Sequence, residues 1–237
     1  MCTSAPYAIP VIVHAVRQLK PRSILDVGVG FGKYGVLFRE YLDVWDAGGL
    51  AATERESWHT RLEGIEIYQE YLTPLHDFIY DEIHIGHALE VIDGLGNYDV
   101  IFMGDVLEHF ERAAGELLIR KLCKHADKCV LLTFPTNAAA RAGLFGNEAE
   151  AHRSVWARAD FERHRNVSYT TVEDRAEIVA ITKPQCEPPF LVGCMAARRR
   201  AGWKGKVATA LVRTIGPSAA STVMGRALGR PIALRTE

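Results

Sequence analysis

Four glycines stand within the ten residues DVGVGFGKYG, which directly follow a short apolar segment. Glycine after a buried strand lets the backbone approach a phosphate or nucleotide closely. Two registrations of this loop are possible. Gly30, Gly32 and Gly35 match GxGxxG, the dinucleotide-binding pattern, whereas Asp26, Gly28, Gly30 and Gly32 match DxGxGxG. The segment therefore predicts a nucleotide-containing ligand and leaves its identity open.

Acidic residues discriminate between the two registrations. The dinucleotide pattern needs an acid about 20 residues beyond its third glycine, at the end of the second strand. That position falls near Thr53 and Glu54, in a polar loop. Starting the pattern at Gly30 would also place Asp26 inside a buried strand, where an unpaired carboxylate is costly. In the other registration Asp26 is the last side chain before the turn and Glu66 ends the second strand, so we favour that one.

A second group of reactive side chains follows the apolar segment YDVIFMG. It contains Asp105, Glu108 and His109. A histidine or a carboxylate can take the proton from an amine or hydroxyl nucleophile. We expect His109 to be the base and Glu108 to assist it. His152 is a further catalytic candidate, on an irregular segment, residues 136–153, that we expect to close over a substrate.

The elements that must position these residues alternate along the chain. Strands are expected at residues 23–28, 62–67, 81–86, 98–104, 127–135, 166–172 and 176–183, and helices at 9–19, 33–44, 68–79, 87–92, 111–125 and 156–164. Strands that alternate with helices predict a parallel sheet covered on both faces, and the closely spaced last pair predicts an antiparallel edge hairpin. The expected fold is α/β: a Rossmann-like, doubly wound, seven-stranded sheet. Ligands of such sheets bind beyond the carboxyl ends of the strands, where all the residues above are expected.

Four segments in order, ILDVGVGFGKYG, GIEIYQEYL, GHALE and YDVIFMGDVLEHF, resemble the class I S-adenosylmethionine-dependent methyltransferases. The resemblance covers roughly residues 5–182 and implies S-adenosylmethionine as cofactor and S-adenosylhomocysteine as product. It implies that the loop Gly28, Val29, Gly30 and Gly32 runs beside the methionine part of the cofactor, which Asp26 helps to hold.

The same resemblance implies contacts for the nucleoside. Glu66 would accept the ribose hydroxyls and Ile67 would pack against the adenine. Many relatives have Asp at the position of His87, and this departure leaves the adenine to His87 or to the backbone of Ala88 and Leu89. Asp105 completes the expected cofactor set.

The spacing Asp105-x-x-Glu108-His109, followed by His152, resembles the ExxEH element of small-RNA 2′-O-methyltransferases and of some ubiquinone-pathway O-methyltransferases. In those enzymes carboxylates and histidines hold a divalent ion, and such ligands suit Mg²⁺, Mn²⁺ or Zn²⁺. Asp105 reaches less far than the usual Glu. We therefore expect no metal and keep Glu108, His109 and His152 as the alternative ligand set.

The function predicted from these residues is methyl transfer from S-adenosylmethionine to an oxygen or nitrogen of a small or medium-sized acceptor, such as a biosynthetic intermediate. Three alternatives remain open. A metal-dependent RNA 2′-O-methyltransferase would bind nucleic acid, and a nicotinamide oxidoreductase would need Glu54 on the ribose. A non-catalytic descendant would bind the cofactor without turnover.

Length and composition predict one domain, residues 1–197, which the resemblance implies is a class I methyltransferase domain, and a basic tail, residues 198–237, that is helical or partly disordered. The tail holds nine of the 28 Lys and Arg residues and one of the 29 acids. Such a tail predicts attraction to a membrane surface or an anionic substrate, and less so to nucleic acid, because Trp203 is its single aromatic residue. Five scattered cysteines, no membrane-length apolar run and no basic leader predict a cytoplasmic protein. The oligomeric state is not predicted.

Overall fold

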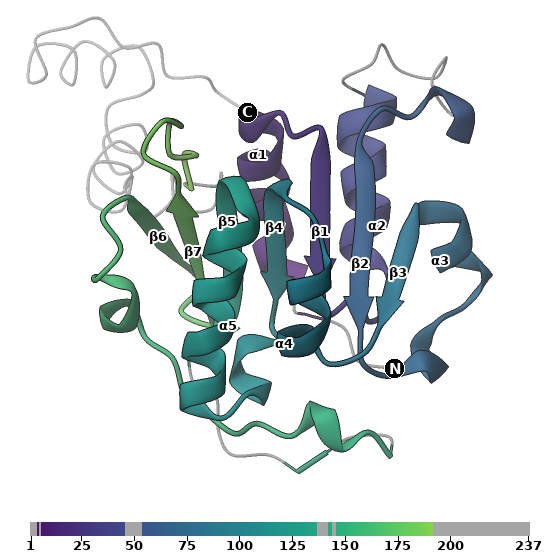
Figure 1. The fold of residues 1–237 in the computed structure, drawn as a ribbon. Coiled ribbons are helices and arrows are strands. Elements are labelled where there is room, and N and C mark those ends of the chain that lie inside the picture. Colours follow the sequence, from purple (N-terminus) through teal and green to yellow (C-terminus); the bar gives the residue numbers. More distant parts are fainter. Residues whose placement is uncertain (1–3, 5, 46–53, 137–141, 144–145, 192–237) are drawn as a thin grey trace, which may run out of the picture. The chain divides into compact units, whose positions relative to one another are not determined.

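The computed structural model describes Ser4 and residues 6–45, 54–136, 142–143 and 146–191 (Figure 1). The chain divides into two units after Leu191, and every described residue belongs to the first. The predicted tail, residues 198–237, lies outside the described residues.

A single seven-stranded sheet forms the centre of the described unit (Figure 1). Its first five strands in the chain pair in parallel, and the last two pair antiparallel at one edge. This confirms the predicted α/β fold, the seven strands and the edge hairpin. The strands, in their order across the sheet, are β3 (Glu82–Ile85), β2 (Arg61–Glu66), β1 (Ser23–Val27), β4 (Tyr98–Gly104), β5 (Ala126–Pro135), β7 (Ala176–Thr182) and β6 (Val167–Val172).

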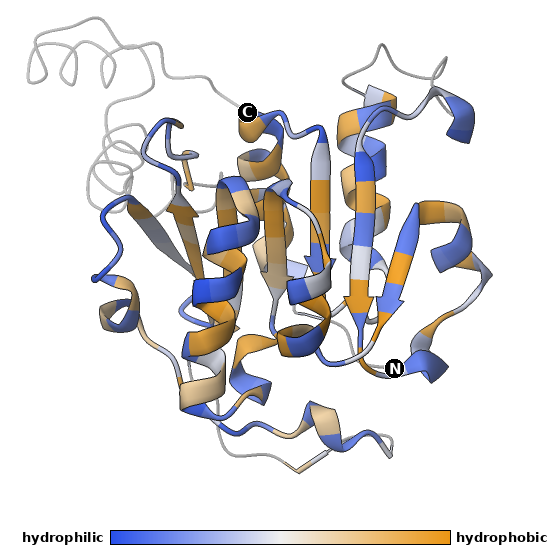
Figure 2. Ribbon diagram, viewed as in Figure 1, coloured by the Kyte–Doolittle hydropathy of each residue, from blue (hydrophilic) through white to orange (hydrophobic). Residues whose placement is uncertain are grey.

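Two apolar layers lie on opposite faces of the sheet, and the ribbon of the central strand β4 is mostly coloured as hydrophobic (Figure 2). Successive side chains of a strand point to opposite faces, so in β4 Phe102 joins one layer and Ile101 the other. The helices α1 (Ile9–Leu19) and α2 (Lys33–Phe38) cover the first layer, and α4 (Ala88–Val91) and α5 (Arg112–His125) cover the second. The near-continuous apolar sequence of β4 therefore follows from burial on both faces.

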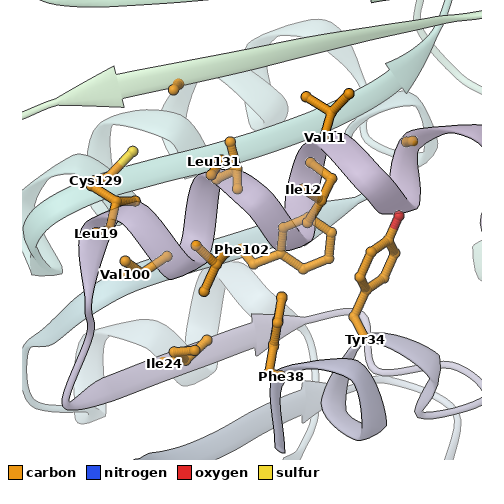
Figure 3. Packing of buried hydrophobic residues seen from close by; sticks show 14 of the residues in the cluster. Val11, Ile12, Leu19, Ile24, Tyr34, Phe38, Val100, Phe102, Cys129 and Leu131 are labelled. Atoms are coloured by element: carbon orange, nitrogen blue, oxygen red, sulfur yellow. The ribbon is translucent and has the colours of Figure 1, made fainter. Parts of the chain in front are cut away.

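Aromatic packing fixes the start of α2 against the sheet (Figure 3). The Tyr34 and Phe102 rings lie 4.5 Å apart, and Phe38 meets Phe102 edge-on at 5.5 Å. Ile12 of α1 packs into the same cluster and is fully buried. Burying each such side chain contributes about 1.5–3 kcal/mol. The helix that follows the glycine loop is thus held rigidly at the carboxyl edge of the sheet.

The helix predicted for residues 33–44 is shorter than expected. α2 ends at Phe38, and a π-helix, Arg39–Trp45, continues it. Arg39 is 2% exposed and pairs with Asp43 at 3.0 Å, while its Nε donates to the Ile79 carbonyl. A buried guanidinium needs such partners. Arg39 finds them at the start of the π-helix.

Two other helix predictions need correction. Residues 156–164 form one 3-10 turn, Arg158–Phe161, instead of a helix. Residues 68–79 divide into a 3-10 turn, Gln69–Tyr71, and the short helix α3 (Pro74–Ile79). Pro74 occupies the first helical position, where its fixed φ and missing N–H are tolerated.

In the part of the chain that the structure describes, no helix combines the length and the apolarity needed to cross a bilayer.

Candidate functional site

A cavity of about 670 Å³ opens at the carboxyl ends of the parallel strands. This volume lies within the range of small-molecule sites, about 300–1,000 Å³. Most of the predicted site residues line it. They are Asp26, Gly28, Val29, Gly30, Glu66, Ile67, His87, Ala88, Asp105, Glu108, His109 and His152. Gly32 and Leu89 are not among the lining residues.

Asp26 lies inside β1, because that strand continues to Val27. The argument that a buried Asp26 disfavours the dinucleotide registration is therefore wrong. The carboxylate is 2% exposed, and the Tyr80 hydroxyl donates a 2.6 Å hydrogen bond to its Oδ2. Burial raises the pKa of Asp26 to about 7, and the Tyr80 hydrogen bond opposes that rise. Pairing with Tyr80 makes the buried position tolerable.

Glu66 ends β2 and is tied to the glycine loop. Its Oε2 accepts the Gly30 N–H at 2.8 Å and its Oε1 accepts the Tyr68 N–H at 2.9 Å. Burial raises the pKa of Glu66, and the backbone donors partly counteract this. Each carboxylate oxygen has two acceptor sites, so capacity remains for two hydroxyl donors. Glu54, the acid that a dinucleotide site would use, is exposed and is not a lining residue.

Steric contacts explain two of the glycines. Gly28 has φ +81°, and a Cβ there would meet Val106 Cγ2 at 2.3 Å. A Cβ on Gly35 would meet the Tyr80 hydroxyl at 2.4 Å. Gly35, the last glycine of the GxGxxG match, is therefore explained by the packing of α2 on Tyr80.

Two aromatic side chains at the end of α3 lie beneath the glycine loop. His76 is 1% exposed, and its Nε2 lies 3.0 Å from the Gly30 carbonyl oxygen. Its ring stacks on Tyr80, with centroids 6.2 Å apart. The sequence prediction missed both residues. Their i, i+4 spacing on a helix that follows a site strand is the signal that could have found them.

His109 ends a 3-10 turn, Leu107–His109, at the carboxyl end of β4. Its Nδ1 lies 3.2 Å from the Ala151 carbonyl oxygen, an atom that can only accept. The N–H of a neutral ring is then on Nδ1 and the basic lone pair is on Nε2. Nε2 lies 3.8 Å from Glu150 Oε2. This geometry suits a general base.

Residues 146–154 lie over His109 and are attached at several points. The N–H groups of Arg153 and Ser154 donate to the Glu108 carbonyl at 2.8 and 3.1 Å. The Tyr71 hydroxyl donates to Glu150 Oε1 at 3.1 Å. Glu150 and Tyr71 both line the cavity, and the sequence prediction missed both. Nothing in local periodicity links residues 79 positions apart.

His152 approaches His109, with ring centroids 5.1 Å apart. Among the described residues, Glu108, His109 and His152 offer ligand atoms that all lie within 4.8 Å of one another. Asp105 is not part of this group, because its Oδ1 accepts the Thr133 hydroxyl at 2.8 Å. Two imidazoles and one carboxylate fit a divalent transition metal.

A second group of possible ligands, Glu63, Glu82 and His84, lies outside the cavity. Glu63 already accepts hydrogen bonds from Arg61 and from the Tyr98 hydroxyl. The neighbouring guanidinium of Arg61 disfavours a bound cation, so we interpret this group as an ion-pair network.

Solved structures of methyltransferases share this fold. The methyltransferase domain of bacterial CtHen1 superposes with a TM-score of 0.51 at 14% identity, covering 75% of this chain and 98% of that one. DhpI in complex with SAM and HEP gives a TM-score of 0.54 at 13% identity, covering 76% and 88%. An O-methyltransferase family protein from Burkholderia thailandensis gives 0.51 at 11% identity, covering 72% of this chain and 54% of that one.

At these low identities the likeness shows the fold alone: the chain has the predicted Rossmann-like fold, which these methyltransferase structures share. This chain spans about half the length of the Burkholderia protein. No protein-family model matches the chain, and no curated protein matches it significantly.

Proposed function

We propose that this protein is an enzyme that transfers a methyl group from S-adenosylmethionine to an oxygen or nitrogen of a small or medium-sized acceptor. One observation carries the proposal: a single cavity is lined both by the predicted cofactor residues, from Asp26 to Glu66, and by His109. The shared fold of methyltransferase structures supports it, and in one of them the protein is complexed with SAM.

S-adenosylmethionine would supply an electrophilic methyl group on a sulfonium that leaves readily. The chain must then orient the acceptor, exclude water and remove a proton. His109 Nε2 takes the proton, and Glu150, at 3.8 Å, stabilises the resulting imidazolium. Residues 147–153 cover the site and limit the access of water.

Calorimetric titration with S-adenosylhomocysteine, NAD and NADP tests the cofactor assignment. We expect only S-adenosylhomocysteine to bind, and Glu66→Gln to weaken its binding about tenfold, since a neutral amide is a weaker acceptor of hydroxyls. Glu63→Gln is the matched control, because Glu63 lies on the same strand but outside the cavity. Binding of a nicotinamide cofactor alone, or equal losses in the two variants, would contradict the assignment.

Turnover tests the role of His109. Release of S-adenosylhomocysteine should be detectable with a mixed panel of small hydroxyl and amine acceptors. His109→Gln should abolish the release and leave S-adenosylhomocysteine affinity within about twofold, because the group acts on the acceptor. A variant that retains full turnover would remove His109 from the mechanism. Cofactor binding with no turnover on any acceptor would favour the non-catalytic alternative.

The 4.8 Å cluster of Glu108, His109 and His152 supports a second candidate, metal-assisted methyl transfer. A bound divalent ion would act there as a Lewis acid beside the acceptor oxygen. Titration of Mn²⁺ into the protein saturated with S-adenosylhomocysteine should then give one site, lost in His152→Ala and kept in His84→Ala. If no Mn²⁺ or Zn²⁺ binds, this candidate fails and His109 remains the base.

The compartment and the anionic partner are also proposals. We infer a cytoplasmic location from the cysteines: Cys123, Cys129 and Cys186 are free thiols, and burial raises the pKa of Cys129 to about 12. We infer an anionic partner, such as a membrane surface, from the basic composition of residues 198–237. In flotation with anionic vesicles, the full chain should move with the vesicles, and a chain truncated after Ala197 should not. Equal flotation of both would contradict the role of the tail.

A further inference from the structure

A tight turn at the edge of the cavity presents an arginine. The turn connects β6 to β7, and Arg175 is its last residue before β7. Glu173 and Asp174 have φ of +52° and +56°, and the Arg175 N–H donates to the Val172 carbonyl at 2.9 Å. This is the type I′ geometry that joins two antiparallel strands in a hairpin, so the hairpin itself sets the place of Arg175.

The end of β5 holds this turn in place. The Thr136 N–H donates to the Arg175 carbonyl at 2.9 Å, and the Thr136 hydroxyl donates to the Asp174 carbonyl at 2.8 Å. Because β5 ends at the carboxyl edge of the sheet, these bonds place Arg175 on the cavity wall. These two bonds from Thr136 therefore hold the turn that carries Arg175.

The guanidinium of Arg175 is oriented by an aromatic ring. It lies 5.9 Å from the centroid of Tyr7, which also lines the cavity. Such a contact directs a cation without neutralising it. Among the described residues, the ion pairs do not include Arg175.

Lys33 is a second cation that lines the cavity. Its Nζ donates to the Ser4 carbonyl and lies 5.0 Å from the centroid of the Tyr34 ring. Burial lowers the pKa of Lys33, and Asp105 and then Asp26 are the acids that counteract this. Ser4 and Tyr7 belong to one short segment before α1, so both cations lie beside that segment. The other acids that line the cavity are Glu66, Glu108, Glu111, Glu148 and Glu150.

We propose that the acceptor carries an anionic oxygen group, a phosphate or a carboxylate, that binds Arg175 with Lys33 as the second cation. This proposal rests on the proposed function, since it places the acceptor in the cavity that also takes the cofactor. An arginine fork matches the geometry of both groups. Arg175 would then select acidic acceptors over neutral ones of the same size.

Three small probes test the proposal on the full-length protein saturated with S-adenosylhomocysteine. Phenyl phosphate, benzoate and neutral phenol are titrated at constant ionic strength. We expect at least one of the two anions to bind about tenfold more tightly than phenol. The anion that binds more tightly than phenol shows whether the group is a phosphate or a carboxylate. If neither anion exceeds phenol, the proposal is wrong.

Substitutions then locate the binding. Arg175→Gln should remove the anion preference, and Arg175→Lys should restore part of it, because the charge returns without the fork. Arg120→Gln is the matched control, an exposed arginine on α5 that does not line the cavity. An equal loss in Arg120→Gln and Arg175→Gln would overturn the proposal.

S-adenosylhomocysteine affinity is measured in parallel for every protein. It should not change in Arg175→Gln, which also shows that the variant is folded. If the wild-type protein does not bind S-adenosylhomocysteine, the proposed function fails. If the wild-type protein binds S-adenosylhomocysteine and Arg175→Gln does not change the affinity for the anions, only the proposal of an acidic acceptor is excluded.

Discussion

The Tyr80 hydroxyl donates a 2.6 Å hydrogen bond to Asp26 Oδ2, joining the residue after α3 to the last but one residue of β1. Both side chains are buried, at 2% exposure each. The same Tyr80 ring lies against Gly35, and its neighbour His76 lies against Gly30. His76 of α3 and Tyr80, the residue after it, thus contact the loop that is predicted to bind the cofactor. A substitution at Tyr80 should therefore change the affinity for the cofactor.

Removing this hydrogen bond should change how cofactor affinity depends on pH. Ionised Asp26 favours a cationic ligand group, so wild-type affinity for S-adenosylhomocysteine should rise as the pH passes about 7. In Tyr80→Phe the pKa of Asp26 rises further, because the hydrogen bond that lowers it is lost. The rise in affinity should move to higher pH. Calorimetry from pH 6 to 9 measures it.

Tyr98→Phe is the control for that experiment. The Tyr98 hydroxyl donates to Glu63, a tyrosine–carboxylate pair outside the cavity. Its removal should leave the pH profile of cofactor binding unchanged. A Tyr80→Phe profile that keeps the wild-type midpoint would show that the pair has only a structural role.

Asp26 should also make the protein less stable as the pH rises. Its folded pKa, about 7, lies above the ordinary value of an aspartate, 3.8. The protonated side chain therefore favours the folded state below pH 4, and this contribution is lost as the pH rises through about 7. Asp26→Asn removes the ionisation. Its free energy of unfolding should exceed that of the wild type at pH 8, by up to about 4 kcal/mol, with little difference near pH 3.5. Urea denaturation at both pH values measures the difference, and a variant that is less stable at pH 8 would contradict the sign.

Gly35 should not tolerate a methyl group. A Cβ there meets Tyr80 at 2.4 Å, so Gly35→Ala should lower the free energy of unfolding by about 1–3 kcal/mol. Alanine is otherwise the better helix former. Gly94→Ala serves as control, because nothing lies within 4 Å of its added Cβ. Thermal denaturation should separate the two variants, and equal stabilities would show that Tyr80 moves aside freely.

The Tyr71–Glu150 hydrogen bond should restrain residues 147–153. Tyr71→Phe removes a 3.1 Å bond to this segment while keeping the ring. Amide hydrogen exchange of residues 149–151 should become several-fold faster, because local opening costs less. Tyr169→Phe, on the exposed face of β6, should leave this exchange unchanged. Unaltered exchange in Tyr71→Phe would mean that the other contacts of the segment hold it without Tyr71, among them the backbone bonds to Glu108 and the contact between His109 and the Ala151 carbonyl.

The periodicity of apolar residues and the positions of proline predicted the helices and strands that depend on local sequence. The helix Ile9–Leu19 was expected at the residues where it forms, because its apolar residues recur with the helical period and Pro21 follows it. The strands, their order along the chain and the positions of Asp26 and Glu66 near strand ends follow from period and burial in the same way. The π-helix after Phe38 was not predictable, since Arg39 finds Ile79 and Asp81 only in the fold.

Local sequence pattern was enough to predict the sheet, the glycine loop and the acids and histidines that follow its strands. It did not predict which distant side chains complete the site. Tyr80 reaches Asp26 across 54 residues, and Tyr71 reaches Glu150 across 79. Arg175 reaches the cavity because β7 pairs with β5 in one register. Periodicity reports how a segment is buried, whereas these contacts depend on how segments pair, and that is decided by packing and hydrogen bonding over the whole chain.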